Sequence, residues 1–148
     1  MVEEPGRRVV AEELAYGGNA LPWEDMQAFA RRTVEMALAD REAVQKSAGW
    51  IFFDRGLIDA SAALSHCKQE PLPDYLTIKY RYNRKVFSTP PWPEIFVEDD
   101  ERRHSLSAAM AEYARLSQVY PSLGYDVTIL PKISVLARAD FVLTELGS

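Results

Sequence analysis

The chain has 148 residues, of which 47% are hydrophobic and 26% are charged, a size and balance that predict a single globular domain over residues 1–148. Its net charge of -5 argues against a nucleic-acid partner, because contacts with phosphate backbones require a basic surface. The single cysteine, Cys67, excludes an internal disulfide and a cysteine-based zinc cluster.

No segment of the sequence has the ~20 consecutive apolar residues that span a bilayer. The acidic N-terminus also differs from a secretory signal, which has basic residues before its apolar stretch. We therefore expect a cytoplasmic protein without a membrane partner.

The first half of the chain is predicted to form helices around one strand. Hydrophobic spacing predicts a short helix over residues 6–15, ended by a pair of glycines, and a longer helix over residues 22–46. The apolar run 50–53 is bounded by turn residues and is typical of a strand buried on both faces. A helix over residues 56–66 is expected to follow it.

The second half is expected to alternate helices with two strands, in the order helix 73–82, strand 85–88, helix 100–120, strand 126–130 and helix 134–145. Residues 75–80 also alternate well enough to form a strand instead. The proline-rich segment 90–93 excludes both helix interior and central strand, which predicts an irregular excursion. This order of elements predicts an α/β fold with a parallel sheet covered on both faces, whose ligands bind at the carboxyl ends of the strands.

The strand at 50–53 is followed directly by Asp54 and Arg55. A carboxylate leaving a buried strand is well placed to bind Mg²⁺, and a neighbouring guanidinium can make paired contacts with a phosphate. We therefore expect Asp54 to be the metal-side carboxylate and Arg55 to be a catalytic residue. The alternative is a strand-end pair that caps a helix and contacts a neighbour.

Two further groups of charged residues fall where strands meet helices or loops. Glu4 lies just before the first helix, with Arg7 and Arg8 in its first turn, an arrangement that suits an acceptor hydroxyl flanked by anionic groups. Arg102 and Arg103 follow the proline-rich excursion and are expected to close as a lid over a triphosphate. The alternative for both groups is a solvated, charged start of a helix.

A phosphate-binding loop of the form G-x-x-x-x-G-K-[ST] is missing from the 148 residues. In folds of this kind the loop would precede Glu4, where only three residues stand. A sheet that loses the strand before this loop is left with interior edges unpaired. We expect a truncated chain that starts inside a longer reading frame, and the alternative is a true loss of the loop.

Five segments in order resemble one family: Glu3–Val10, Gly17–Trp23, Phe52–Gly56, Arg81–Phe87 and Pro90–Phe96. The family is that of small bacterial AAA-type P-loop proteins, predicted ATPases similar to the ribosylnicotinamide kinase domain of NadR-type proteins. The resemblance implies a three-layer, nucleoside-kinase-like P-loop fold, incomplete at its N-terminus, that uses ATP and Mg²⁺. It also implies that Glu4 is the base toward the acceptor hydroxyl, that Asp54 and Arg55 occupy the Asp-Arg position, and that Arg102 or Arg103 belongs to the lid.

The function expected from these features is phosphoryl transfer from a nucleotide to a small-molecule acceptor, or ATP hydrolysis, in the full-length family. The chain alone is expected to be inactive, because it lacks the phosphate cradle. One alternative is a catalytically dead pseudo-NTPase that acts as an interaction module and associates, also with a second copy, through exposed sheet edges. A remnant without a biochemical role is the third possibility.

Overall fold

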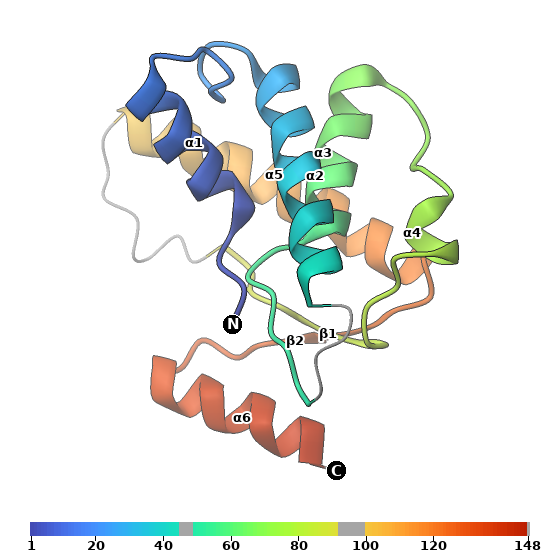
Figure 1. Cartoon of the computed structure of the whole chain (residues 1–148). Coiled ribbons are helices and arrows are strands. Elements are labelled where there is room, and N and C mark those ends of the chain that lie inside the picture. Colours follow the sequence, from blue (N-terminus) through green and yellow to red (C-terminus); the bar gives the residue numbers. More distant parts are fainter. Residues whose placement is uncertain (45–48, 92–99, 148) are drawn as a thin grey trace. The chain divides into compact units, whose positions relative to one another are not determined.

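A computed structural model describes residues 1–44, 49–91 and 100–147, without the side chains of 100–105 (Figure 1). The chain divides into two compact units, Met1–Arg81 and Tyr82–Ser148, and each is described here by itself. The expectation of one domain over the whole chain stays a prediction. In the described ranges, no helix is long and apolar enough to cross a membrane.

The first unit is helical, with α1 at Pro5–Tyr16, α2 at Met26–Ala43, α3 at Leu57–Lys68 and a short α4 at Tyr75–Ile78. The predicted first helix is confirmed: a proline opens α1, and Gly17 ends it with a φ of 70°. The second helix begins later than predicted, because the Asp25 carboxylate caps it by accepting a bond from the backbone N–H of Ala28.

The core of the first unit lies between α2 and its neighbours α1 and α3, which pack beside it (Figure 1). Small residues allow this close packing, and the buried apolar side chains are Val9, Leu21, Ala30, Val34, Ala37, Leu57, Ile58, Ala60, Ala62 and Leu76. The helix predicted over 73–82 is reduced to the single turn of α4, where Leu76 is the one buried residue. Most helical stability comes from packing an apolar face, and this segment has little to pack.

The strand predicted over 50–53 is largely wrong. Only Phe53 takes part in a bridge, which pairs it in parallel with Val2. Trp50 is 57% exposed and Phe52 is 38% exposed, so the segment is not buried on both faces. A strand is buried in that way only when neighbours flank it and helices cover both of its faces. Within the described part of this unit, its recorded backbone partner is Val2 alone.

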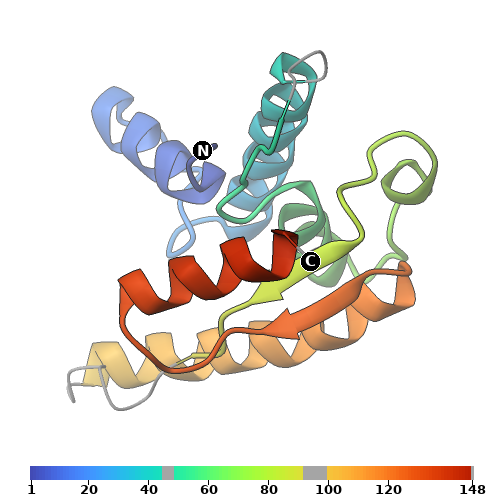
Figure 2. The same cartoon turned by 90° about the horizontal axis from the view of Figure 1, so that it is seen from below.

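The second unit has the predicted alternation of strands and helices. Strand β1, Lys85–Ser88, pairs in parallel with β2, Asp126–Ile129, while helices α5, Asp100–Ser122, and α6, Val135–Gly147, lie on opposite sides of the pair (Figures 1 and 2). Ser134 caps α6 as expected, because its hydroxyl accepts a bond from the N–H of Ala137. The layering is therefore helix, parallel sheet, helix, and the sheet contains two strands among the described residues.

Candidate functional site

The parallel bridge between Val2 and Phe53 places the residues that follow each of them side by side. The N–H of Val2 donates to the carbonyl of Phe52 at 2.7 Å, and the N–H of Asp54 donates to the carbonyl of Val2 at 2.9 Å. Two residues beyond the bridge on each side stand Glu4 and Arg55, and Glu4 Oε1 lies 4.0 Å from Arg55 Nε. The structure thus brings together two residues that the sequence singled out fifty positions apart.

Glu4 also meets a second guanidinium. Its Oε2 lies 3.3 Å from Nε of Arg7, one turn along α1. Glu4 occupies the N-cap position of α1, yet its side chain makes no capping bond there. A Cβ on Gly6 would lie 3.3 Å from a ring carbon of Phe29, a tight contact, and 3.5 Å from Glu4 Oε1, an ordinary one.

Exposure differs among these three side chains. Glu4 is 23% exposed, Arg55 46% and Arg7 87%, so the carboxylate is sheltered and the cations are open to solvent. The N-terminus of α1 adds the positive end of its dipole. This corner of the unit is therefore a sheltered carboxylate in a cationic setting.

Arg55 adopts an unusual backbone conformation, with a φ of 55°. A non-glycine residue in the left-handed region costs about 1 kcal/mol, and such strain is found most often at functional sites. Among the described non-glycine residues only Gln69 shares it, and Gln69 ends helix α3, a position where that conformation is common. At Arg55 it turns the chain from the bridged segment into α3.

Asp54 is exposed beside this pair. Within the described ranges, no three His, Cys, Asp or Glu side chains gather closely enough to hold a metal ion. Magnesium does not require such a cluster, because it is usually bound by one or two carboxylates together with water and substrate phosphates. The carboxylate oxygens of Asp54 are donors of the kind that Mg²⁺ prefers.

Arg8 differs sharply from its neighbour Arg7. Its Nη1 donates to Asp40 Oδ1 on α2 at 3.1 Å, its Nη2 donates to Asp40 Oδ2, and Nη2 also reaches the carbonyl of Glu3 at 3.0 Å. The hydrogen bond to Asp40 raises the pKa of Arg8. Arg8 thus ties the start of α1 to α2, whereas its predicted role in substrate binding stays a prediction.

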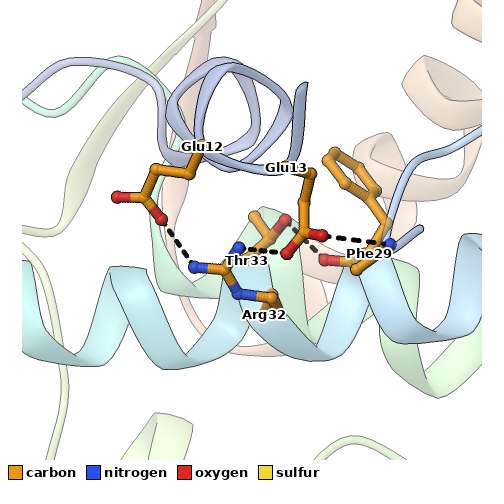
Figure 3. A network of polar contacts seen from close by, with 6 residues as sticks. Glu12, Glu13, Phe29, Arg32 and Thr33 are labelled. Atoms are coloured by element: carbon orange, nitrogen blue, oxygen red, sulfur yellow. Dashed lines mark hydrogen bonds and ion pairs between the residues drawn. The ribbon is translucent and has the colours of Figure 1, made fainter. Parts of the chain in front are cut away.

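A second ionic link joins the other ends of the same two helices (Figure 3). Arg32 on α2 donates to Glu13 Oε1 at 2.5 Å and to Glu12 Oε2 at 2.6 Å. The hydrogen bonds that Arg32 donates, first to Glu12 and then to Glu13, raise its pKa. The free oxygen of Glu13 accepts the N–H of Ala20 at 3.4 Å, which holds the loop after α1.

The sequence did not reveal Asp40, Glu13 or Arg32 as part of the frame around the site. In the structure these pairs are nested, because position 8 pairs with 40 and position 13 with 32, as in two antiparallel helices. With both of its ends tied to α2, helix α1 holds Glu4 in a defined place.

The predicted lid lies in the second unit. Arg102 and Arg103 are in the first turn of α5, and their side chains fall outside the described residues. Of the proline-rich excursion, residues 92–93 also fall outside them. The lid therefore stays a prediction.

Comparison with known proteins gives one match, to a family model. A family model described as an AAA domain matches residues 1–138. No curated protein and no solved structure matches the chain.

Proposed function

Because the chain belongs to the AAA domain family of P-loop NTPases, we propose that Glu4, Asp54 and Arg55 form the acceptor and metal side of a phosphoryl-transfer site. The observation that carries the proposal is the 4.0 Å approach of Arg55 Nε to Glu4 Oε1, next to the parallel bridge of Val2 with Phe53. In parallel sheets ligands bind beyond the carboxyl ends of the strands, and both residues follow the two segments that this bridge pairs in parallel.

Each residue has a chemical role that its position supports. Glu4 takes the proton of the acceptor hydroxyl while that oxygen bonds to the terminal phosphorus of ATP and the bond to the leaving ADP oxygen breaks. Arg55 offers a guanidinium to the transferred phosphoryl group. Asp54 would hold Mg²⁺, which when bound neutralises phosphate charge. Arg102 and Arg103 are assigned to a lid on the nucleotide side.

The cradle for the nucleotide phosphates is not among the 148 residues, since the motif G-x-x-x-x-G-K-[ST] does not occur in them. We therefore expect the chain alone to bind ATP with a dissociation constant weaker than about 1 mM and not to hydrolyse it. Isothermal titration calorimetry with MgATP measures this. Micromolar binding would show that the phosphates are held by other residues of this chain.

The role of Asp54 is testable without turnover. Mn²⁺, as a paramagnetic substitute for Mg²⁺, is expected to broaden the backbone NMR signals of residues 3–5 and 54–56 first. The Asp54→Asn variant should lose this selective broadening, whereas Asp74→Asn, an exposed aspartate of the same unit, should keep it. Equal broadening in Asp54→Asn would remove Asp54 from the metal side.

One observation favours a second function, an interaction module that pairs with another copy of the chain. The exposed rings of Trp50 and Phe52 stand on a segment that is bridged at Phe53 alone among the described residues. Exposed apolar edges of this kind recruit a further strand. Sedimentation velocity should then show a dimer that Phe52→Lys dissociates, and a monomer at all concentrations contradicts this function.

A further inference from the structure

Two kinds of contact hold the short segment that leads to Glu4. Val2 makes two backbone hydrogen bonds across the parallel bridge, at 2.7 and 2.9 Å. The carbonyl of Glu3 then accepts a hydrogen bond from Arg8 Nη2 at 3.0 Å. Glu4 follows directly, so the place of its backbone depends on both the bridge and the arginine.

The bond to Glu3 depends in turn on Asp40, near the C-terminal end of α2. Arg8 Nη1 donates to Asp40 Oδ1 at 3.1 Å, and Nη2, the atom that reaches Glu3, also donates to Oδ2. Both charged side chains are partly buried. A guanidinium is a rigid planar fork, so a carboxylate that binds two of its nitrogens fixes its orientation. Asp40 therefore orients Arg8 toward the carbonyl of Glu3.

The next residue of α2, Arg41, contacts the other side of the bridge. Its guanidinium carbon lies 5.9 Å from the centre of the Phe53 ring, which is a cation–π contact. Its Nη2 also donates to the carbonyl of Arg81 at 2.7 Å. Phe53 is the bridged residue, and Asp54 and Arg55 follow it. Two consecutive side chains of one helix thus hold the two segments on which the candidate site stands.

We propose that Asp40 and Arg41 are positioning residues of the phosphoryl-transfer site. The proposal rests on the function proposed above. Asp40 acts through Arg8 on the segment that carries the base, and Arg41 acts on the segment that carries the metal carboxylate. Reacting groups need to be held to within about 0.5 Å by side chains that are themselves locked in place. The C-terminal end of α2 provides this support, and it sets the distance between the two halves of the site.

Hydrogen exchange of the whole chain tests the role of Asp40 without metal or substrate. The N–H of Asp54 donates to the carbonyl of Val2 and exchanges when the bridge opens, whereas the N–H of Ala37, a buried residue of α2, reports on larger unfolding. Asp40→Asn keeps the size of the side chain and removes one of its two acceptors. It should accelerate exchange of the Asp54 N–H about tenfold more than that of the Ala37 N–H, as expected for the loss of a charge-assisted hydrogen bond.

Arg32→Ala is the matched control, because it breaks the ionic link between α1 and α2 at the opposite end of α1. It should destabilise the helices while leaving the bond from Arg8 to Glu3 in place. The two reporter N–H groups should then accelerate by equal factors. If Asp40→Asn also accelerates them equally, Asp40 serves stability alone and the proposal is overturned.

Two conservative variants separate the contributions of the arginines. Arg8→Lys keeps a cation beside Asp40 but lacks the planar fork, so its selective effect on the Asp54 N–H should lie between those of Asp40→Asn and the unchanged chain. Arg41→Met keeps an unbranched side chain and removes the cation from the Phe53 ring. It should accelerate the same N–H selectively by about threefold, since cation–π contacts contribute less than charge-assisted hydrogen bonds. Equal acceleration of both reporters in Arg41→Met removes Arg41 from the proposal.

Mn²⁺ bound at Asp54 reads the distance across the site. In Asp40→Asn the broadening of residues 54–56 should remain and that of residues 3–5 should weaken, because broadening falls steeply with distance from the ion. If Mn²⁺ does not gather at Asp54 in the unchanged chain, the metal side of the proposed function is wrong, and hydrogen exchange still decides the role of Asp40. If Mn²⁺ gathers there and Asp40→Asn leaves the broadening of residues 3–5 unchanged, the site stands and the positioning role is wrong.

Discussion

The two ends of helix α1 use the same residue types in opposite proportions. At its C-terminal end, the guanidinium of Arg32 is shared by two carboxylates, Glu12 and Glu13, at 2.5–2.6 Å (Figure 3). At its N-terminal end, the carboxylate of Glu4 is shared by two guanidinium groups at 3.3 and 4.0 Å. We call the Arg32 cluster the closed end, because its ion pairs are short. We call the Glu4 cluster the open end, because its ion pairs are longer and its arginines are more exposed.

The difference separates a structural contact from a binding surface. At the C-terminal end, Glu12 and Glu13 both pair with Arg32, and Glu13 also accepts a hydrogen bond from the loop N–H of Ala20. These contacts all stabilise the fold. At the N-terminal end the ion pairs of Glu4 are longer, and Arg7 is 87% exposed. We expect substitutions at the closed end to change stability and substitutions at the open end to change ligand binding.

The largest effect is expected at Asp40, which neutralises Arg8 beside the open end. Asp40→Ala removes both carboxylate bonds from a half-buried guanidinium, and we expect it to lower the free energy of unfolding by about 2 kcal/mol. Urea denaturation measures this. The matched control is Glu35→Ala, at an exposed position of the same helix, which should cost less than about 0.5 kcal/mol.

Arg32→Ala should have the next largest effect, because it breaks both ion pairs of the closed end at once. We expect a loss of about 1–2 kcal/mol that shrinks in 1 M NaCl, since these groups are partly exposed. The carboxylates that raise the pKa of Arg32 stabilise its charged form. Its contribution is therefore complete below the unfolded pKa of arginine and is lost only as the pH rises through the higher folded value. A loss that is insensitive to salt would contradict an ionic link.

A smaller effect is expected at Gly18, in the loop that Glu13 holds. A Cβ there would lie 1.6 Å from Glu13 Oε2, so Gly18→Ala must push the carboxylate aside. Only the end of a flexible side chain has to move, and we expect a loss of about 1 kcal/mol. Combined with Glu13→Gln, the effect should be less than additive, because both changes disturb the same carboxylate. Additive losses would mean that Gly18 acts through its backbone.

Local signals predicted most of the fold. The bounds of β1 agree residue for residue with the prediction, and α1 and α6 agree closely, because a proline, a glycine and Ser134 mark where these helices begin or end. The errors lie where tertiary packing decides. The run 50–53 has the composition of a buried strand but is bridged at a single residue within the described part of its unit, and α4 is one turn long because little of it is buried.

The candidate site divides in the same way. Glu4 meets Arg55 because the parallel bridge of Val2 with Phe53 sets the residues that follow each of them side by side. Asp40 and Glu13 were missed, since a pairing between helices depends on their mutual register, which no local pattern gives. The difference between Arg7 and Arg8 was missed for the same reason. Adjacent positions on a helix face different neighbours, and which of the two faces Asp40 depends on how α1 packs on α2.

The smallest effect on stability and the sharpest separation of the two ends are expected at Arg7. Its exposed ion pair with Glu4 contributes little, so Arg7→Ala should change the free energy of unfolding by less than about 0.5 kcal/mol. Arg32→Ala should cost more stability than Arg7→Ala, because it breaks two ion pairs at 2.5–2.6 Å. Thermal unfolding of both variants gives the comparison directly. If Arg7→Ala destabilises the chain as much as Arg32→Ala does, then the open end is a structural contact like the closed one.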